Sequence, residues 1–332
     1  HRNKRSLTLN LKSPEGVAIF KKLVTWADVV VENYRPDVKF RLGIDYESLK
    51  PLNPRLVYAS ISGYGQDGPY RLRPGFDQIA QGMGGLMSVT GMPGQGPMRA
   101  GIAVADSSSG LYCAFGILAA LLEREVSGEG QWVQTSLLQA QIAMMDFQAA
   151  RWLQDRQVPP QAGNNHPTSI PTGVFKTKDG YINIAASGPA IWERFCHAVG
   201  GEHWLQNPDY ATSAARSKNR DKLNAEIEEK IKTRPSAEWI DLLNDAGVPC
   251  GPIYTVDQVF EDPQVKHLGM AAPVQHPKLG LTHVINQPVI LSRTPSEIRT
   301  PTPGAGEHNA EILGALGYSA GDIEGLKQRG VI

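Results

Sequence analysis

Histidine is nearly absent from the first half of this 332-residue chain: after His1, the next histidine is His166. Without an imidazole, that half cannot supply the general base of Ser-His-Asp hydrolysis or of His-paired cysteine chemistry. Cysteine is also scarce, and its three positions, Cys113, Cys196 and Cys250, lie far apart. We therefore expect reduced, buried thiols instead of a disulfide framework, and no group of His, Cys, Asp and Glu has the spacing of a metal site.

Neither sign of charge is in excess, since Lys plus Arg and Asp plus Glu each total 33. This balance gives no overall field that would attract nucleic acid or an anionic membrane. Long apolar runs are missing too, because none approaches the roughly 18 residues of a membrane span. The opening HRNKRSLTLN lacks the apolar segment of a signal peptide. We expect a cytoplasmic protein that acts on a small molecule, with no nucleic-acid or membrane partner.

Strand and helix patterns alternate in residues 1–150. Apolar, β-branched stretches predict strands at 7–11, 28–33 and 56–62. Ser13 followed by Pro14 has the pattern of an N-cap and a first helical residue. Further helices are predicted at 46–53, 107–125 and 137–154. Since apolar strands separated by helices are typical of a parallel sheet covered on both faces, we predict an α/β fold with a doubly wound domain at 1–150.

The composition changes after Arg151. Residues 151–170 are rich in Pro, Gly and Asn, which is typical of a linker or a functional loop. Residues 171–265 predict a smaller α+β domain, with a hairpin turning at 178–180. The helices predicted for this domain are at 189–200, 221–234 and 236–246. After it, the sequence predicts two strands within 270–291 and two helices at 306–316 and 319–329.

The stretch GYGQDG (63–68) matches G-x-G-x-x-G and follows a predicted strand. A dinucleotide-binding turn must open a helix, so that its backbone N–H groups face the pyrophosphate. Here PYRLRPG follows, with two prolines and no helical pattern. We therefore interpret 63–68 as a tight turn near a pocket.

Asp106 ends a mostly small and apolar run and is followed by three serines and a long apolar helical stretch. Aspartate is a favoured N-cap, so the residue can be explained by capping alone. A carboxylate at a helix N-terminus is also ionised at neutral pH and can act as a nucleophile without a general base, which suits a half-chain without histidine. Local pattern leaves both roles open.

Basic residues follow the first predicted strands. Lys12 comes after LTLNL, and Arg35 and Arg41 come just after VVVEN. Ligands of open α/β sheets bind at the carboxyl ends of the strands, so these cations have the position of a phosphate site. Solvated surface charge explains them equally well.

Several long stretches resemble the class III CoA-transferase family, which includes formyl-CoA and carnitine CoA-transferases and the α-methylacyl-CoA racemases. The similar stretches begin with NKRSLTLNLKSPEG, run through DVVVENYRPDVKFRLGIDYESLKPLNPRLVYASISGYGQDGPY and GIAVADSSSGLYCAFGILAALLERE, and end with AGVPCGPIYTVDQVFEDPQV and GEHNAEILGALGYSAGDIEGLKQRGVI. Together they cover essentially the whole chain.

The resemblance implies a Rossmann-like large domain, a small domain inserted in it, and an interlocked homodimer. Residues 266–332 would then return to the large domain. Members of the family carry a strand and a helix before the NKRSL motif, so we expect an N-terminal part to be missing here.

The resemblance also implies the site residues. Asp106 matches the catalytic aspartate. The positions that match CoA-contacting residues are Leu9, Lys12, Asn33, Tyr34, Val38 and Arg41. Coenzyme A is then a substrate carried by an acyl-CoA, with a small carboxylic acid as the second partner, no tightly bound cofactor and no metal.

The resemblance predicts an acyl-CoA:carboxylate CoA-transferase that works through a covalent aspartyl intermediate. Two alternatives remain. A racemase uses a histidine in the segment that matches 76–85, where this chain has Phe76, Asp77 and Gln78, so racemisation would need Asp77 as a substitute. A non-catalytic CoA-binding protein is the other alternative. The family's glycine-rich loop matches 162–170, where only Gly163 is a glycine.

Overall fold

In the computed structural model, which describes all of residues 1–332, the apolar stretches around 30 and 59 form the parallel strands β1 (Val29–Glu32) and β2 (Val57–Ser62). A third parallel strand, β3 (Trp132–Ser136), pairs with β2 and gives the order β1-β2-β3. β3 was not among the strands expected from the sequence. The central strand β2 is almost continuously buried, as expected for a parallel strand covered on both faces. The α/β class with a parallel sheet is thereby confirmed.

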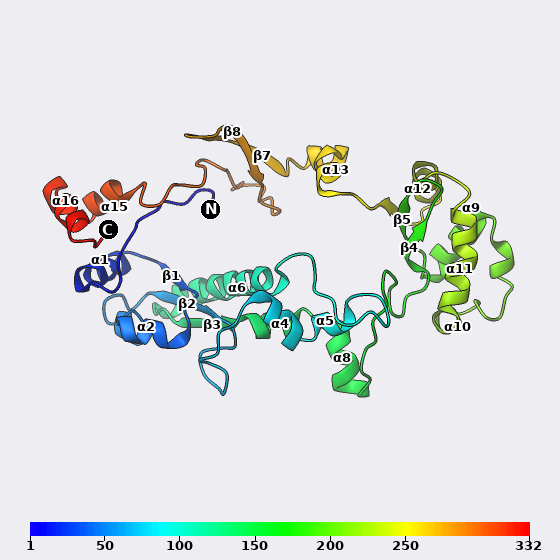
Figure 1. Ribbon diagram of the computed structural model, residues 1–332, viewed down its shortest axis with the longest axis horizontal. Coiled ribbons are helices and arrows are strands. Elements are labelled where there is room, and N and C mark those ends of the chain that lie inside the picture. The colour runs from blue at the N-terminus through cyan, green and yellow to red at the C-terminus, as the bar shows by residue number, and fades with distance from the viewer. The chain divides into compact units, whose positions relative to one another are not determined.

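The chain divides into two units. The first unit is His1–Gly85, Gly101–Asp146 and Phe260–Ile332, and the second unit is Leu86–Ala100 and Phe147–Val259. Figure 1 labels the elements of both. The domain boundaries inferred from the sequence, at 150, 170 and 265, stay a prediction.

The strand predicted at 7–11 is wrong. Its backbone forms no ladder, and its hydrogen bonds go to the C-terminal segment: Asn10 N donates to Val331 O at 2.8 Å and Thr8 N donates to Asn309 Oδ1 at 2.9 Å. Leu7 and Leu9 pack against the cluster of Ile19, Leu313, Leu326 and Val331. Leu7 and Leu9 thus bury one side of the segment, as alternating apolar residues of a strand do. Their packing partner is the helical C-terminal segment, which offers no strand edge for a ladder of hydrogen bonds.

In the first unit, α1 and α3 begin where the sequence predicts and α6 begins three residues earlier than predicted, whereas α2 and α4 were not predicted. α1 begins at Pro14 after the N-cap Ser13, although the Ser13 side chain makes no capping hydrogen bond. The other bounds between β1 and β3 are α2 (Pro36–Leu42), α3 (Tyr46–Leu49), α4 (Asp77–Met83), α5 (Leu86–Val89, in the second unit) and α6 (Val104–Ser127).

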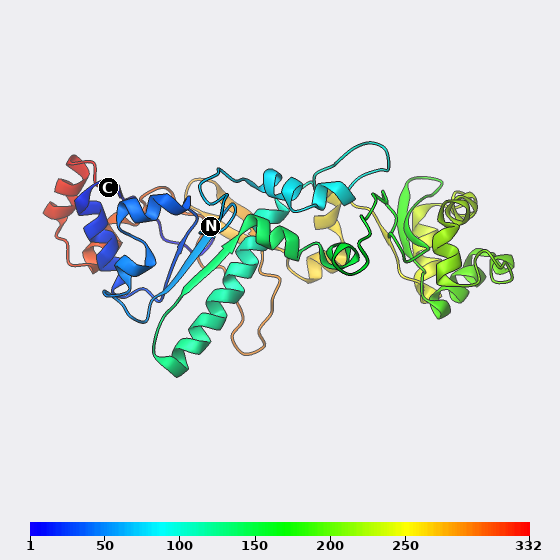
Figure 2. The ribbon, with the colours of Figure 1, turned by 90° about the horizontal axis from the view of Figure 1, so that it is seen from below.

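Helix α6 packs against β2 and β3, and its buried residues include the small Ala105, Ser108 and Ala120. By length and composition alone it is apolar enough to cross a membrane, in contrast to the expectation that no apolar run approaches a membrane span. One such helix is weak evidence, because core helices pass the same test. Figure 2 shows α6 running along the sheet and beyond its edge.

The single helix predicted at 137–154 is two helices, α7 (Leu137–Ala143) and α8 (Asp146–Asp155). Asp146 has φ +44°, a left-handed conformation that interrupts the helix. The apolar pattern continues across this break and therefore does not reveal it.

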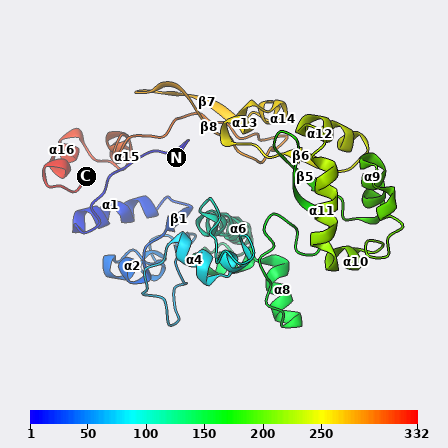
Figure 3. The ribbon, with the colours of Figure 1, turned by 45° about the vertical axis from the view of Figure 1, so that its right-hand side comes forward.

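In the second unit, the predicted hairpin is confirmed as β4 (Thr172–Lys176) and β5 (Tyr181–Ala185), and β6 (Cys250–Pro252) adds an antiparallel strand. Helices pack against this sheet (Figure 3). Between them, the rings of Trp192, Phe195 and Trp204 stack on one another. The bounds of these helices are α9 (Pro189–Val199), the 3₁₀ turn η1 (Glu202–Trp204), α10 (Ser213–Lys218), α11 (Arg220–Ile231) and α12 (Ser236–Asp245).

The C-terminal part of the chain, from residue 256 onward, contains the two predicted strands. They are β7 (Ala271–His276) and β8 (Gly280–Ile285), which form an antiparallel pair. The helices of this part are α13 (Val256–Glu261), α14 (Pro263–His267), α15 (Asn309–Ala315) and α16 (Ala320–Gln328). Leu313 and Leu326 pack with Ile19 of α1, so the two ends of the chain share one apolar cluster (Figures 1 and 2).

Candidate active site

Asp106 lies in the first turn of α6 but is not its N-cap. The helix begins at Val104, and Ala103 is the cap residue. The capping role that local pattern allowed for Asp106 is therefore wrong, because the helix starts earlier than the pattern indicates and a residue far away in the sequence supplies the cap.

That residue is Asp77, the first residue of α4. Its Oδ1 accepts hydrogen bonds from the backbone N–H groups of Ala105, at 2.8 Å, and Asp106, at 3.4 Å. Gln81 Nε2 donates to Asp77 Oδ2 at 2.6 Å and to the carbonyl of Ile102 at 3.1 Å. The N-terminus of α6 is thus held from α4, and a carboxylate satisfies amides that begin the helix.

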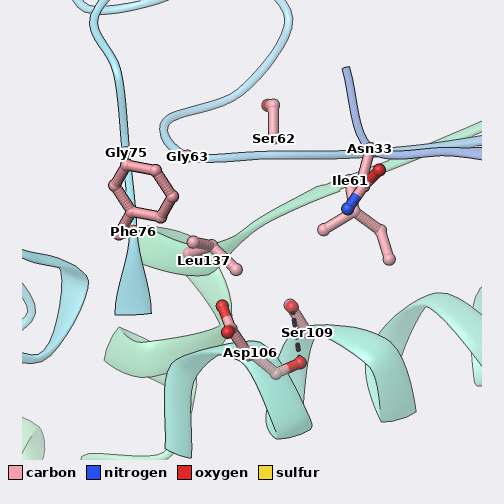
Figure 4. A pocket seen from close by; sticks show the side chains of 9 residues that line it. All are labelled: Asn33, Ile61, Ser62, Gly63, Gly75, Phe76, Asp106, Ser109 and Leu137. Atoms are coloured by element: carbon pink, nitrogen blue, oxygen red, sulfur yellow. Dashed lines mark hydrogen bonds between the residues drawn. The ribbon is translucent and has the colours of Figure 1, made fainter. Parts of the chain in front are cut away.

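The side chain of Asp106 enters a pocket of about 450 Å³ in the first unit. Figure 4 shows Asp106 and Ser109 on α6 facing the strand ends that carry Asn33 and Ile61. The full lining is Asn33, Ile61, Ser62, Gly63, Gly75, Phe76, Asp106, Ser109 and Leu137. This is the carboxyl end of β1 and β2, where open α/β sheets bind ligands.

The loop between β2 and α4 closes one side of this pocket. Its two ends cross at Gly63 and Gly75, and a Cβ on Gly75 would lie 2.7 Å from Gly63 Cα. Within the loop, Gly65 and Gly68 have left-handed backbones, at φ +105° and +77°. The motif 63–68 is therefore a turn that opens no helix, as predicted. The two ends of the loop, Gly63 and Gly75, approach each other too closely for either to carry a side chain.

Two effects raise the pKa of the Asp106 carboxyl above its ordinary value: the larger is its partial burial, and the smaller is the negative charge of Asp77. Both effects disfavour the ionised form. Asp106 is nevertheless accessible to solvent. A carboxylate whose pKa is raised is more basic, and hence a stronger nucleophile once ionised, than a free aspartate.

The structure brings only some of the predicted CoA-contacting residues to this pocket. Asn33 lines it, Tyr34 follows at the start of the turn into α2, and Val38 and Arg41 lie on α2. Arg41 pairs with Asp37 at 3.3 Å, at an exposed position.

The other two predicted residues lie outside the pocket lining. Leu9 packs against the apolar cluster shared by α1, α15 and α16. Lys12 is exposed and lies just before α1. Arg35, also considered as a phosphate ligand, pairs with Asp37 at 2.6 Å. The cations Lys12, Arg35 and Arg41 therefore do not converge on one point within the pocket.

Residues 162–170 belong to the second unit. His166 Nδ1 accepts hydrogen bonds from the backbone N–H groups of Thr168, at 3.2 Å, and Ser169, at 2.9 Å, and its ring stacks on Phe147. His166 and Asn164 line a second pocket of about 480 Å³ in that unit.

Comparison with known proteins identifies the family. The sequence profile described as "CoA-transferase family III" matches residues 1–309. The chain belongs to CoA-transferase family III. It is 39% identical to the succinate–glutarate CoA-transferase of Agrobacterium fabrum over 95% of this chain and 79% of that protein. It is 34% identical to the human succinyl-CoA:glutarate CoA-transferase, over 100% and 76%.

Among solved structures, a CAIB/BAIF family protein from Brucella suis is similar, with a TM-score of 0.83, 36% identity and coverage of 95% of this chain and 82% of that one. The protein is thus a class III CoA-transferase, an enzyme of a family whose substrates are CoA thioesters. The family assignment predicted from the sequence is confirmed.

The sequence of this class III CoA-transferase did not reveal the role of Asp77, which was considered only as a substitute base for racemisation. The available signal was an aspartate followed four residues later by Gln81 at the start of a short helix. That pattern predicts a local hydrogen bond, which the structure contains, but not the distant helix that Asp77 caps.

Proposed function

We propose that this class III enzyme is an acyl-CoA:carboxylate CoA-transferase and that Asp106 is its covalent nucleophile. The observation that carries the proposal is the position of Asp106: it is solvent-accessible, lies in a pocket at the carboxyl ends of β1 and β2, and is held by Asp77 through its backbone. A pocket of about 450 Å³ is within the range of sites for small ligands.

In the first half-reaction, an Asp106 carboxylate oxygen attacks the thioester carbonyl carbon of the acyl-CoA. The C–S bond breaks, CoA thiolate leaves, and a mixed anhydride forms on Asp106. The thiolate then attacks the Asp106 carbonyl carbon and displaces the donor acid as its carboxylate. An aspartyl-CoA thioester remains, and no proton is consumed.

The second half-reaction reverses these steps with the acceptor. Its carboxylate attacks the aspartyl thioester, releases CoA thiolate and forms a new mixed anhydride. The thiolate attacks the acceptor's carbonyl carbon, which frees the Asp106 carboxylate and releases the new acyl-CoA. Each step exchanges bonds of similar energy, so positioning and exclusion of water are the protein's main contributions.

We propose that Asn33, Tyr34, Val38 and Arg41 line the CoA channel and that Leu9 and Lys12 border the adenosine and its phosphates. The first four follow one another from the end of β1 into α2, next to the pocket. Asn33 contributes a carboxamide, which both donates and accepts hydrogen bonds, to the pocket that holds Asp106.

The substrates we propose are short dicarboxylic acids and their CoA esters. The support is the similarity to enzymes named succinate–glutarate and succinyl-CoA:glutarate CoA-transferase, at 39% and 34% identity. Succinyl-CoA as donor and glutarate as acceptor are therefore the first pair to test.

The experiment compares the wild-type chain with Asp106→Asn and Asp106→Ala. With succinyl-CoA and a panel of free acids, mass spectrometry follows CoA transfer and searches for a CoA adduct on the peptide that contains Asp106. We expect both variants to lose at least about 10³-fold in transfer and to form no adduct, while Asp241→Asn, at an exposed position on α12, retains full activity.

Transfer that survives in Asp106→Ala would reject the mechanism. Exchange of α-protons with deuterated water, without movement of CoA between acids, would indicate a racemase. CoA binding without either reaction would indicate a binding protein.

A further inference from the structure

A buried ionic cluster lies behind the Asp106 pocket. The Lys39 side chain on α2 is completely buried, and its Nζ donates to Glu32 Oε1 at 2.9 Å, to Ser60 Oγ at 3.3 Å and to Gln66 Oε1 at a shorter distance. The three protons of the ammonium thus have three acceptors.

Further hydrogen bonds extend the network, although the Gln66 Nε2 group is buried without a partner. Ser60 Oγ donates to Glu32 Oε1 at 2.5 Å and accepts from Trp132 Nε1 at 2.9 Å. Glu32 Oε2 accepts from the backbone N–H of Tyr34 at 2.8 Å. One connected network therefore joins β1, α2, β2, β3 and the loop that begins at Gly63.

The strand register places this network directly against the pocket. Glu32 pairs with Ser60 across the two strands, and both side chains enter the cluster. Asn33, the residue that follows β1, and Ile61 of β2 line the Asp106 pocket instead. Since successive side chains of a strand point to opposite faces, the same two strand ends hold the cluster on one face and the pocket on the other.

The network also controls the backbone of both segments that border the pocket. Glu32 fixes the turn at Tyr34, next to Asn33. Gln66 lies in the loop whose ends, Gly63 and Gly75, form part of the pocket wall. Lys39 connects the two, because it donates to Glu32 and Gln66 at once.

Stability alone does not explain a buried ion pair at this place. Replacement of such a pair by apolar side chains of similar volume is often neutral or stabilising, because both charges must lose their hydration. What apolar side chains cannot do is to specify a position for the amide of Gln66.

We propose that Lys39 is a positioning residue that holds the Gly63–Gly75 loop against the Asn33 turn, and so sets the shape of the CoA-ester site. The inference rests on the proposed function of the Asp106 pocket. It assigns no chemical step to Lys39, which has no place in the pocket lining.

The test uses Gln66, because a change there leaves the Lys39–Glu32 pair intact. Gln66→Met keeps the size of the side chain and removes the acceptor, while Gln66→Glu restores an acceptor for Lys39. We expect Gln66→Met to raise the KM for succinyl-CoA about tenfold, as the loss of one charge-assisted hydrogen bond predicts, with kcat nearly unchanged. Gln66→Glu should recover most of the loss, and Gln328→Met, an equivalent change on α16, should have no effect.

A second pair of variants tests Lys39 directly. Lys39→Met alone leaves Glu32 buried without its cation and can prevent folding. The double variant Lys39→Met/Glu32→Gln removes both charges, and we expect it to fold and to show the same rise in KM.

A readout independent of activity is tryptic cleavage after Arg71, which is exposed in the same loop. Cleavage should be several-fold faster in Gln66→Met than in the wild type and should slow again in Gln66→Glu. If folded Gln66→Met and the double variant both keep the wild-type KM, the inference is overturned. If the wild-type chain transfers no CoA, the proposed function fails, and the positioning role of Lys39 is then judged by tryptic cleavage alone. Equal cleavage rates in Gln66→Met and the wild type overturn that role, and faster cleavage in Gln66→Met supports it.

Discussion

Asp77 Oδ1 lies 3.4 Å from the backbone nitrogen of Asp106 and accepts its N–H. The same carboxylate that caps α6 is therefore also a negative charge next to the proposed nucleophile. These two effects act in different ways, since the hydrogen bond positions Asp106 whereas the charge raises the pKa of its carboxyl.

Asp77→Asn separates the two effects. The amide oxygen can still accept from Ala105 and Asp106, but the charge is gone, and the Gln81 amide must rotate to face the new NH₂ group. The pKa of Asp106 should fall towards its ordinary value. Because the nucleophile must be ionised, activity is lost as the pH falls through that pKa, and the acid limb of kcat against pH should move to lower pH.

The control for this pH profile is Asp241→Asn, which removes a charge from an exposed position on α12 in the second unit. It should leave the acid limb in place. An acid limb that stays in place in Asp77→Asn as well would show that Asp77 does not tune Asp106.

Gly75→Ala should distort the wall of the Asp106 pocket. The new Cβ would lie 2.7 Å from Gly63 Cα, which is backbone and cannot rotate away. We expect a loss of at least about 1 kcal/mol of unfolding free energy, as for other overpacked sites, and a clear loss of transfer activity. Thermal unfolding and the transfer assay measure the two effects.

Gly314→Ala is the matched control, since a Cβ at that position on α15 meets no atom within 4 Å. Helix propensity predicts equal or slightly higher stability and unchanged activity. Equal behaviour of the two variants would mean that the Gly63–Gly75 crossing does not determine the pocket.

We propose that the enzyme is a homodimer, as the family resemblance implies, and that α6 contributes to the interface. Leu111, Phe115, Leu118 and Leu122 recur at intervals of three and four along α6 and are 58–73% exposed. Exposed apolar stripes of this kind mark contact surfaces. Phe115→Glu should lower the molecular mass in solution from that of a dimer to that of a monomer, as measured by light scattering.

Leu279→Glu adds the same charge at an exposed apolar position between β7 and β8 and should leave the dimer intact. A wild-type chain that is monomeric at micromolar concentration would contradict the proposal.

Arg216 holds the second unit together without a carboxylate partner. Its buried guanidinium donates to the carbonyls of Ile170, at 2.9 Å, Tyr210, at 3.0 Å, and Ser187, at 2.8 Å. Lysine cannot reproduce this fork, so Arg216→Lys should leave buried carbonyls unpaired and cost about 2–4 kcal/mol. Amide hydrogen exchange in β4 and β5 should become correspondingly faster.

Arg220→Lys, at a surface pair with Asp221, should change the exchange of the same amides by less than about twofold. Unchanged protection of β4 and β5 in Arg216→Lys would show that the three carbonyls find other partners.

Local patterns predicted most of the secondary structure. β1, β2, the β4–β5 hairpin and the start of α1 follow from β-branched runs, a turn at 178–180 and the Ser13-Pro14 pair. These signals need only neighbouring residues. β3 was missed because WVQTS is short and only partly buried, so no long apolar run marks it.

The sequence by itself determined the family, the absence of histidine from the first half of the chain, and Asp106 as the candidate nucleophile, because each depends only on residue identity and order. Only the tertiary structure decided that Asp77 caps α6, that Leu9 packs against the C-terminal helices and that Lys39 joins Glu32 to Gln66. These contacts join residues that no local periodicity relates. Chain folding brings them together, and the burial of their polar groups then requires partners that the sequence does not name.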